Sequence, residues 1–219
     1  VLSSMKYLIA NWKAHKTLKE VKDWIGIFKE NLSSDHDQTT VILAAPAPHL
    51  SFVKKEIEGI TQVYCAAQSV SDEPEGSFTG EVTAKALDGV ATYCIVGHSE
   101  RRARGETKEQ VDAQIKNLKV SDIVPILCIR GVEDFPVGYS GIVAYEQPEA
   151  IGTGNNTAVD EVMEVYRNLN LSQDSTFLYG ASVDENNCVE YLDHPEIKGF
   201  VVGTASLDPK QFTKILEKI

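Results

Sequence analysis

Eight short apolar segments recur along the chain, and a helical pattern follows seven of them. They comprise residues 7–10, 41–45, 63–67, 93–96, 124–129, 142–145, 176–179 and 200–202. Near-continuous apolar strands are typical of a parallel sheet that is covered on both faces. An open doubly wound sheet usually has fewer strands and a Gly-rich first turn, whereas the first turn here is Asn11-Trp12-Lys13. The alternation therefore favours a single α/β domain over residues 1–219, a closed (β/α)8 barrel.

The predicted helices carry apolar residues at spacings of three and four, as one face of a helix does. The first contains Leu18, Val21, Ile25, Phe28 and Leu32. Thr107 and Gln110 have the spacing of a capping box, and Asp208 before a proline predicts the start of the last helix. By the same logic, Thr157 and Asp160 are expected to cap the helix between the sixth and seventh strands.

The connection between the fifth and sixth strands departs from this pattern. Residues 130–140 contain Gly and Pro, lack helical periodicity and barely reach the dozen residues that a parallel crossover needs. We expect a bare loop where a barrel has its fifth helix. The outer faces of strands five and six would then lack cover, unless neighbouring helices or another subunit pack there.

Composition narrows the class of protein and its partners. The net charge of −11 disfavours binding to nucleic acid and to anionic membranes, because phosphate binding depends largely on Lys and Arg. The apolar runs are far shorter than the ~18 residues of a membrane span, and no leader pattern precedes Met5. Cys65, Cys94, Cys128 and Cys188 form no CxxC pair, so we expect buried free thiols in a reducing cytoplasm rather than disulfides or a metal site.

Polar and small residues cluster directly after the strands, where a (β/α)8 barrel carries its function. They are Asn11, Lys13, Gly97, His98, Ser99, Glu100, Glu146, Gly180, Ala181, Ser182, Gly203, Thr204 and Ala205. Taken singly, each has a structural alternative: a solvated lysine, a core histidine or a tight turn. Together they predict one lysine, one histidine, one carboxylate and several anion-binding backbone loops at one end of the barrel. This combination indicates a catalytic site for a small anionic substrate.

The stretch that contains Glu146 has a layout of its own. A strand ends in this carboxylate, a Gly-rich segment follows, and a helix begins beyond it. This layout suits a catalytic base beside a closing lid, whereas the alternative is a surface glutamate before a linker.

Six motifs together resemble the triosephosphate isomerase family. They are Ala10-Asn11-Trp12-Lys13, Ile95-Val96-Gly97-His98-Ser99-Glu100-Arg101-Arg102, Ala144-Tyr145-Glu146, Ala150-Ile151-Gly152-Thr153-Gly154, Tyr179-Gly180-Ala181-Ser182-Val183 and Val202-Gly203 with Ala205-Ser206-Leu207. The match runs in order from about Lys6 to the C-terminus and is interrupted at the fifth strand–helix unit. The resemblance implies a TIM barrel that interconverts dihydroxyacetone phosphate and D-glyceraldehyde 3-phosphate through a cis-enediolate, in glycolysis and gluconeogenesis, without cofactor or metal.

The resemblance also implies roles for five residues. Glu146 would be the base that moves the proton, and one carboxylate suffices because the proton leaves and returns on one face of the enediolate. His98 would polarise the carbonyl as a neutral imidazole, since a helix N-terminus disfavours the imidazolium. Lys13 and Asn11 would stabilise the developing oxyanion. Glu100 resembles a buried carboxylate near this lysine.

By the same resemblance, backbone N–H groups of Gly152, Ser182, Gly203 and Thr204 would bind the phosphate. The family usually has Gly where this chain has Ala181 and Thr204. Both residues keep their N–H group, so binding survives if their φ is negative. A positive φ would instead store strain of about 1–2 kcal/mol.

The polar segment from residue 68 to 81 matches the family's third loop in length. The resemblance places Thr79 in the neighbouring subunit's site and assigns supporting positions to Gln68, Arg102 and Glu106. A solvated loop is the alternative, but a loop this long in a compact barrel usually has a function. We therefore expect a homodimer.

The first hinge of the lid is a further departure from the family. It is Gln147-Pro148-Glu149, where the family usually has Pro, an aliphatic residue and Trp. A charged Glu149 cannot fill an aromatic pocket, so we expect a less tightly closing lid and lower turnover.

Two other functions remain as alternatives at this stage. One is a phosphate-binding barrel that acts on a larger sugar phosphate, and the other is an inactive barrel kept for assembly or regulation. The inactive barrel predicts loss of Lys13, His98 or Glu146, and all three residues are present.

Overall fold

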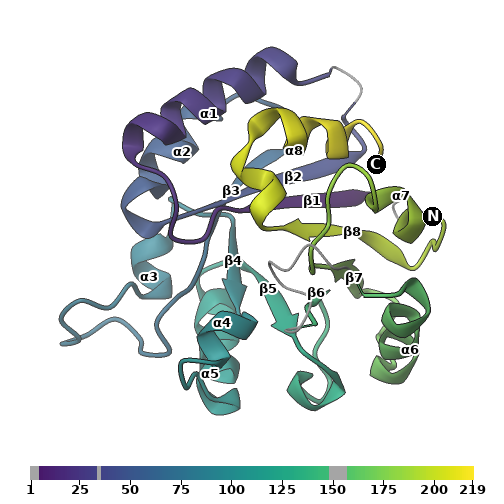
Figure 1. Ribbon diagram of the computed structural model, residues 1–219. Coiled ribbons are helices and arrows are strands. Elements are labelled where there is room, and N and C mark those ends of the chain that lie inside the picture. The colour runs from purple at the N-terminus through teal and green to yellow at the C-terminus, as the bar shows by residue number, and fades with distance from the viewer. Residues whose placement is uncertain (1–4, 34–35, 148–156) are drawn as a thin grey trace.

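The computed structural model describes residues 5–33, 36–147 and 157–219, in which eight parallel strands close into a barrel in sequence order (Figure 1). The strands are β1 (Lys6–Asn11), β2 (Thr39–Ala45), β3 (Val63–Ala67), β4 (Tyr93–Val96), β5 (Val124–Ile129), β6 (Ile142–Tyr145), β7 (Thr176–Tyr179) and β8 (Ile197–Val202). β1 pairs with both β2 and β8, which closes the sheet. The predicted (β/α)8 architecture is confirmed.

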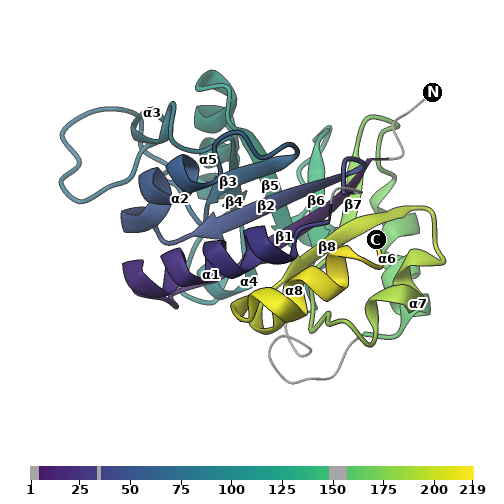
Figure 2. The same cartoon turned by 90° about the horizontal axis from the view of Figure 1, so that it is seen from above.

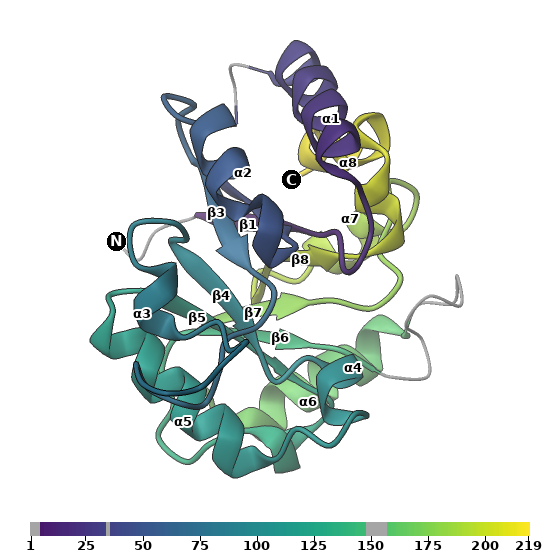
Figure 3. The ribbon, with the colours of Figure 1, turned by 90° about the vertical axis from the view of Figure 1, so that its left-hand side faces the viewer.

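Helices surround the sheet, as Figure 3 shows. They are α1 (Leu18–Asn31), α2 (Leu50–Glu56), α3 (Ala84–Leu87), α4 (Ser99–Arg102), α5 (Lys108–Val120), α6 (Val159–Leu169), α7 (Cys188–Leu192) and α8 (Pro209–Leu216), with 3-10 turns η1 (Ala47–His49), η2 (Val132–Asp134) and η4 (Thr204–Leu207). One buried cluster lies between strands and helices, and a second fills the barrel interior. Because successive strand residues face opposite sides, each strand contributes to both clusters.

The predicted starts of α5 and α8 are confirmed. Thr107 and Gln110 form a reciprocal capping box, in which each side chain bonds the other residue's backbone N–H. Asp208 caps α8 by accepting a hydrogen bond from the backbone N–H of Lys210 at 2.8 Å. These caps satisfy backbone donors that no helical carbonyl reaches.

The predicted cap of α6 is wrong. Its N-cap is Ala158, which has no side chain able to accept a hydrogen bond. Thr157 lies just outside the helix, and its backbone N–H donates to the hydroxyl of Tyr179 at 2.8 Å instead. Asp160 is exposed in the first turn, where its charge suits the helix dipole. Contacts made by the folded barrel therefore replace the local capping pattern.

The crossover from β5 to β6 is short and lies between α5 and α6 in Figure 1. Residues 130–141, all of them described, contain no α-helix. They do contain the 3-10 turn η2, which the prediction of a bare loop did not include. Phe135 and Tyr139 pack edge to face, with ring centroids 6.0 Å apart, and only 7% of Tyr139 is exposed. The Tyr139 hydroxyl bonds the carbonyls of Pro125 and Ile142. The crossover itself, contacted by α6, thus covers this part of the sheet.

The segment between β3 and α3 extends away from the barrel (Figures 1 and 2). Residues 74–81 are all exposed, and they include the side chain of Phe78. Within the described part of the chain, no helix is both long and apolar enough to span a membrane.

Candidate active site

A cavity of about 420 Å³ lies at the carboxyl ends of the strands. Its lining residues are Asn11, Lys13, His98, Glu146, Gly180, Ser182, Val183, Asp184, Glu185, Asn186, Val201, Gly203, Thr204, Ala205 and Gln211. They follow or end β1, β4, β6, β7 and β8, because the carboxyl ends of parallel strands meet at one end of a barrel. The cavity thus gathers most of the predicted site residues, which are far apart in the sequence.

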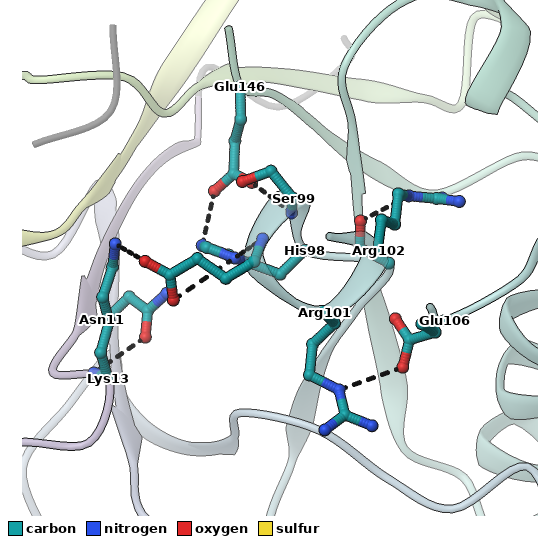
Figure 4. Close-up of polar contacts among 10 residues, drawn as sticks. Asn11, Lys13, His98, Ser99, Arg101, Arg102, Glu106 and Glu146 are labelled. Carbon is teal, nitrogen blue, oxygen red and sulfur yellow. Dashed lines mark hydrogen bonds and ion pairs between the residues drawn. The ribbon is translucent and has the colours of Figure 1, made fainter. Parts of the chain in front are cut away.

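Glu146 and His98 both line this cavity and contact each other (Figure 4). The Glu146 Oε1 atom lies 3.1 Å from the Nε2 atom of His98, and the residues are only 2% and 5% exposed. Glu146 Oε2 accepts hydrogen bonds at 3.3 Å from both the backbone N–H and the hydroxyl of Ser99. Sequence reasoning assigned no role to Ser99, because this contact joins positions 47 residues apart.

The hydrogen bonds of His98 assign its tautomer. His98 is the N-cap of α4, and its Nδ1 atom accepts a hydrogen bond from the backbone N–H of Glu100 at 3.1 Å. Since Nδ1 accepts, a neutral His98 carries its proton on Nε2, which can donate into the cavity.

Two opposing effects act on the pKa of His98. Burial lowers the pKa of His98, but the carboxylate of Glu146, helped by Glu100, outweighs burial and raises it above 6.5. Direct contact with the full charge of Glu146 acts against the partial positive charge at the N-terminus of α4, and the neutral imidazole expected from the sequence stays a prediction.

Lys13 lies opposite this pair in an unusual backbone conformation. Its φ is 52°, and its backbone N–H donates to Asn11 Oδ1 at 3.2 Å. Its ammonium lies 2.5 Å from Glu100 Oε1. Partial burial raises the pKa of Glu100, but its bond to Lys13 prevails and holds that pKa below its ordinary value. The Glu100 side chain is 53% exposed, so its expected burial is wrong for this chain.

Small and apolar groups surround the Glu146 side chain. A Cβ atom at Gly180 would lie 3.2 Å from Glu146 Cγ, so glycine leaves room here for the carboxylate arm. On another side, burial first and then the charge of Glu146 raise the pKa of the Cys128 thiol well above its usual range. Cys128 therefore stays neutral beside the carboxylate and adds no competing charge.

The loops after β7 and β8 both line the cavity. Ser182 has a φ of 48°, and its carbonyl accepts a hydrogen bond from Asn187 Nδ2 at 2.9 Å. Neither Ala181 nor Thr204 has a positive φ, so the strain considered for these replacements of glycine does not arise. Thr204 follows Gly203 and begins η4.

Three predicted positions, Pro148, Glu149 and Gly152, lie outside the described residues. The residues on either side of that segment contact each other: the Thr157 hydroxyl donates to Gln147 Oε1 at 2.5 Å.

The predicted supporting residues lie around the site rather than in it. Gln68 Nε2 donates to the carbonyl of Ala44 at 2.8 Å, which joins the loop after β3 to β2. Arg102 Nε donates to the carbonyl of Gly97 at 2.8 Å. Thr79 is exposed on the extended segment and does not line this chain's own cavity.

Glu106 follows α4 in the chain, and its side chain is only 5% exposed. One of its carboxylate oxygens accepts from Arg101 Nε at 3.2 Å and from Gln114 Nε2 at 3.0 Å. It thereby joins the short helix α4 to α5. Throughout the described ranges, no group of three or more His, Cys, Asp or Glu side chains is arranged to hold a metal ion.

Comparison of the sequence with known proteins identifies the family of the chain. A family model described as triosephosphate isomerase matches residues 6–135 and 137–219. Curated relatives with the name triosephosphate isomerase include one from Aquifex aeolicus, 34% identical over 245 residues that cover 96% of this chain and 98% of the relative. Relatives from Picosynechococcus and Mesomycoplasma hyopneumoniae are each 33% identical over 240 residues, covering 98% and 96% of this chain and 99% and 98% of the relatives.

These alignments are longer than the 219-residue chain, so the relatives contain residues that this chain lacks. The family match is itself interrupted at Pro136, which lies in the short crossover between β5 and β6.

Proposed function

The chain belongs to the triosephosphate isomerase family, and we propose that Glu146 is the base of its reaction. That reaction interconverts dihydroxyacetone phosphate and D-glyceraldehyde 3-phosphate and is a step of glycolysis. Run in the opposite direction, it serves gluconeogenesis. The observation that carries the proposal is the contact between Glu146 Oε1 and His98 Nε2, 3.1 Å apart in a buried end of the cavity.

In the proposed mechanism, the substrate separates these two side chains. The substrate carbonyl oxygen takes the place of Glu146 Oε1 at His98 Nε2. The Glu146 carboxylate removes a proton from the carbon next to the carbonyl, and the electrons of that C–H bond form a cis-enediolate. The hydroxyl proton then passes from one enediolate oxygen to the other through His98 Nε2, which gives a proton to the first and takes one from the second. The same carboxyl group returns the carbon-bound proton to the neighbouring carbon, which converts ketose into aldose.

The charge that develops on the enediolate oxygen needs stabilisation in a water-poor site. His98 Nε2 donates a hydrogen bond to it once Glu146 has turned to the substrate carbon. Lys13 supplies the positive charge and Asn11 a second donor, and the hydrogen bond between Asn11 and the Lys13 backbone supports their shared placement. Glu100 orients the Lys13 ammonium through the ion pair at 2.5 Å.

Backbone N–H groups of Ser182, Gly203 and Thr204 are proposed to bind the phosphate, together with Gly152, which lies outside the described residues. The first three line the same cavity as Glu146 and His98. A volume of about 420 Å³ lies at the small end of ligand pockets, which supports a triose phosphate over a larger sugar phosphate.

A coupled isomerase assay on the purified protein and on Glu146→Gln tests this proposal. The substitution keeps the shape of the side chain but removes its basicity, so turnover should fall by roughly 10³-fold. Glu164→Gln on the exposed face of α6 is the matched control and should retain parental activity. Equal rates for the parent and Glu146→Gln would refute the mechanism, and an inactive parent would support the alternative of a structural barrel.

We further propose a homodimer in which the extended segment from residue 68 to 81 brings Thr79 to the neighbouring site. The exposure of residues 74–81 supports this, because a projecting loop of this length in a compact barrel usually has a function. Sedimentation equilibrium should give twice the chain mass. Thr79→Asp should shift the protein towards the monomer, and a parental protein that is monomeric would contradict the assembly.

A cytoplasmic location is also proposed. Its support is the state of the four cysteines, which are buried and unpaired in the structure, as a reducing compartment favours.

A further inference from the structure

We propose that Asp134, in the short crossover between β5 and β6, is a positioning residue for both catalytic loops. It touches neither the cavity nor the reacting atoms, and it acts through Arg102 and Arg130. This inference rests on the proposed roles of His98 and Glu146.

The first connection runs from Asp134 to the loop that carries His98. Asp134 Oδ1 lies 3.5 Å from Arg102 Nη1, and the two side chains are only 7% and 4% exposed. Arg102 Nε in turn donates to the carbonyl of Gly97, the residue before His98 (Figure 4). The guanidinium packs so closely against Gly97 that a Cβ atom there would lie 2.6 Å from Arg102 Nη2. Arg102 therefore holds the backbone of Gly97, the residue directly before His98, in place.

The second connection runs from Asp134 to the strand end that holds Glu146. Asp134 accepts three hydrogen bonds from Arg130: from its backbone N–H at 3.0 Å, from Nε at 2.8 Å and from Nη2 at 2.9 Å. The peptide unit before Arg130 contains the carbonyl of Ile129, which accepts a hydrogen bond from the Glu146 backbone N–H at 2.8 Å. Asp134 thus fixes the peptide to which the main chain of Glu146 is bonded.

The charges explain why a carboxylate is needed at this position. Asp134 is the only acidic partner of the Arg102 guanidinium among the described residues, and Arg102 Nη2 has no hydrogen-bond partner there. A buried guanidinium that loses its carboxylate is strongly unfavourable and moves towards water or another acceptor. Such a movement would carry the Gly97 carbonyl with it and change the 3.1 Å separation between His98 and Glu146.

The expected kinetic signature is confined to the chemical step. Among the described residues, the side chain of Asp134 bonds to Arg102 and Arg130 and not to the loops after β7 and β8, where the phosphate is proposed to bind. Misplacement of catalytic groups by a distant mutation can cost up to about 10²-fold in rate. Asp134→Asn should therefore lower kcat by roughly 10- to 100-fold while KM stays close to the parental value.

The experiment compares Asp134→Asn with Glu133→Gln, which removes a neighbouring exposed acid on the same turn. Both variants are assayed for kcat and KM, and thermal unfolding confirms that each is folded at the assay temperature. The His98 ring nitrogens are followed by ¹⁵N NMR. We expect a loss of kcat and a changed His98 titration in Asp134→Asn alone. Arg102→Lys, which keeps the charge but not the planar donor geometry, should show the same signature and serves if Asp134→Asn does not fold.

Two results would overturn the inference. One is equal kcat for Asp134→Asn and Glu133→Gln in an active protein, which would leave the isomerase mechanism standing. The other is a parallel change of kcat and KM with an unaltered His98 titration, which indicates general loss of structure. An inactive parent would instead refute the proposed function.

Discussion

The two walls of the cavity are built on different principles. On one wall, Lys13, His98 and Glu146 are charged or titratable side chains, and a polar partner orients each of them. On the other wall, the loops that contain Ser182 and Thr204 are proposed to bind the phosphate through backbone N–H groups, whose direction depends on φ and ψ. A side-chain wall depends on residue identity, whereas a backbone wall accepts any residue that can adopt its conformation. If the proposed roles hold, a replacement of glycine in the second wall is tolerated, whereas a replacement of Lys13, His98 or Glu146 in the first wall is not.

The largest expected effect is loss of the base on the side-chain wall. Glu146→Gln should lower kcat by roughly 10³-fold, because an amide cannot accept the proton. KM should change little, since the proposed phosphate contacts lie on the other wall. A large rise in KM with unchanged kcat would show that the two walls do not divide their functions in this way.

Loss of the donor should be the next largest effect. His98→Gln removes the group proposed to stabilise the enediolate oxygen, and kcat should fall by about 10²-fold. Pre-steady-state trapping of the enediolate provides the measurement. Equal amounts of trapped intermediate in the parent and in His98→Gln would argue against this role.

The pH dependence tests the coupling within the side-chain wall. Because Glu146 outweighs burial and raises the pKa of His98 above 6.5, the free protein should keep His98 protonated to a higher pH than an ordinary histidine. The stabilisation from this pair is therefore present below the ordinary pKa and is lost as the pH rises through the raised one.

An NMR titration of the His98 ring measures this pKa directly. In Glu146→Gln the pKa of His98 should be lower than in the parent, because burial still lowers it and the charge of Glu146 no longer raises it. His49→Gln, which lies outside the cavity, is the control and should leave the titration of His98 unchanged. The same pKa for His98 in the parent and in Glu146→Gln would show that the two groups are not coupled.

On the backbone wall, a smaller effect is expected from the side chain that supports the loop. Asn187 donates to the carbonyl of Ser182 at 2.9 Å and accepts from the backbone N–H of Asp184 at 3.0 Å. Asn187→Ala removes both bonds and should raise KM roughly three- to tenfold, with kcat less affected. The affinity for inorganic phosphate, measured by competitive inhibition, should fall in parallel. A selective fall of kcat would contradict the assignment of this loop to phosphate binding.

The smallest effect is expected from restoring the residue that the family prefers. Thr204→Gly should leave kcat and KM within about twofold of the parent, because Thr204 is unstrained and its N–H group is retained. The free energy of unfolding, from urea titration, should fall by less than about 1 kcal/mol. A clear gain in phosphate affinity would show that the threonine side chain obstructs the site.

Much of the fold follows from local patterns that act over a few residues. The bounds predicted for β3 to β7 are those of the structure, because each is a compact apolar run between polar breakers. The caps at Thr107 and Asp208 likewise depend on neighbouring residues alone. Thr157 shows the limit of this reasoning. Its backbone N–H donates to the hydroxyl of Tyr179, 22 residues away, and not to a neighbouring side chain as in a local capping box.

The sequence by itself determined the (β/α)8 alternation and the family, and it singled out Lys13, His98 and Glu146 as candidate site residues. These inferences depend on periodicity and on motifs of adjacent residues. Only the tertiary structure decided how these groups influence one another. The raised pKa of His98, the role of Ser99 beside Glu146 and the connection through Asp134 all arise from contacts between different strands. Electrostatic and hydrogen-bond energies depend on distances of a few ångströms, and those distances exist only once the barrel has closed.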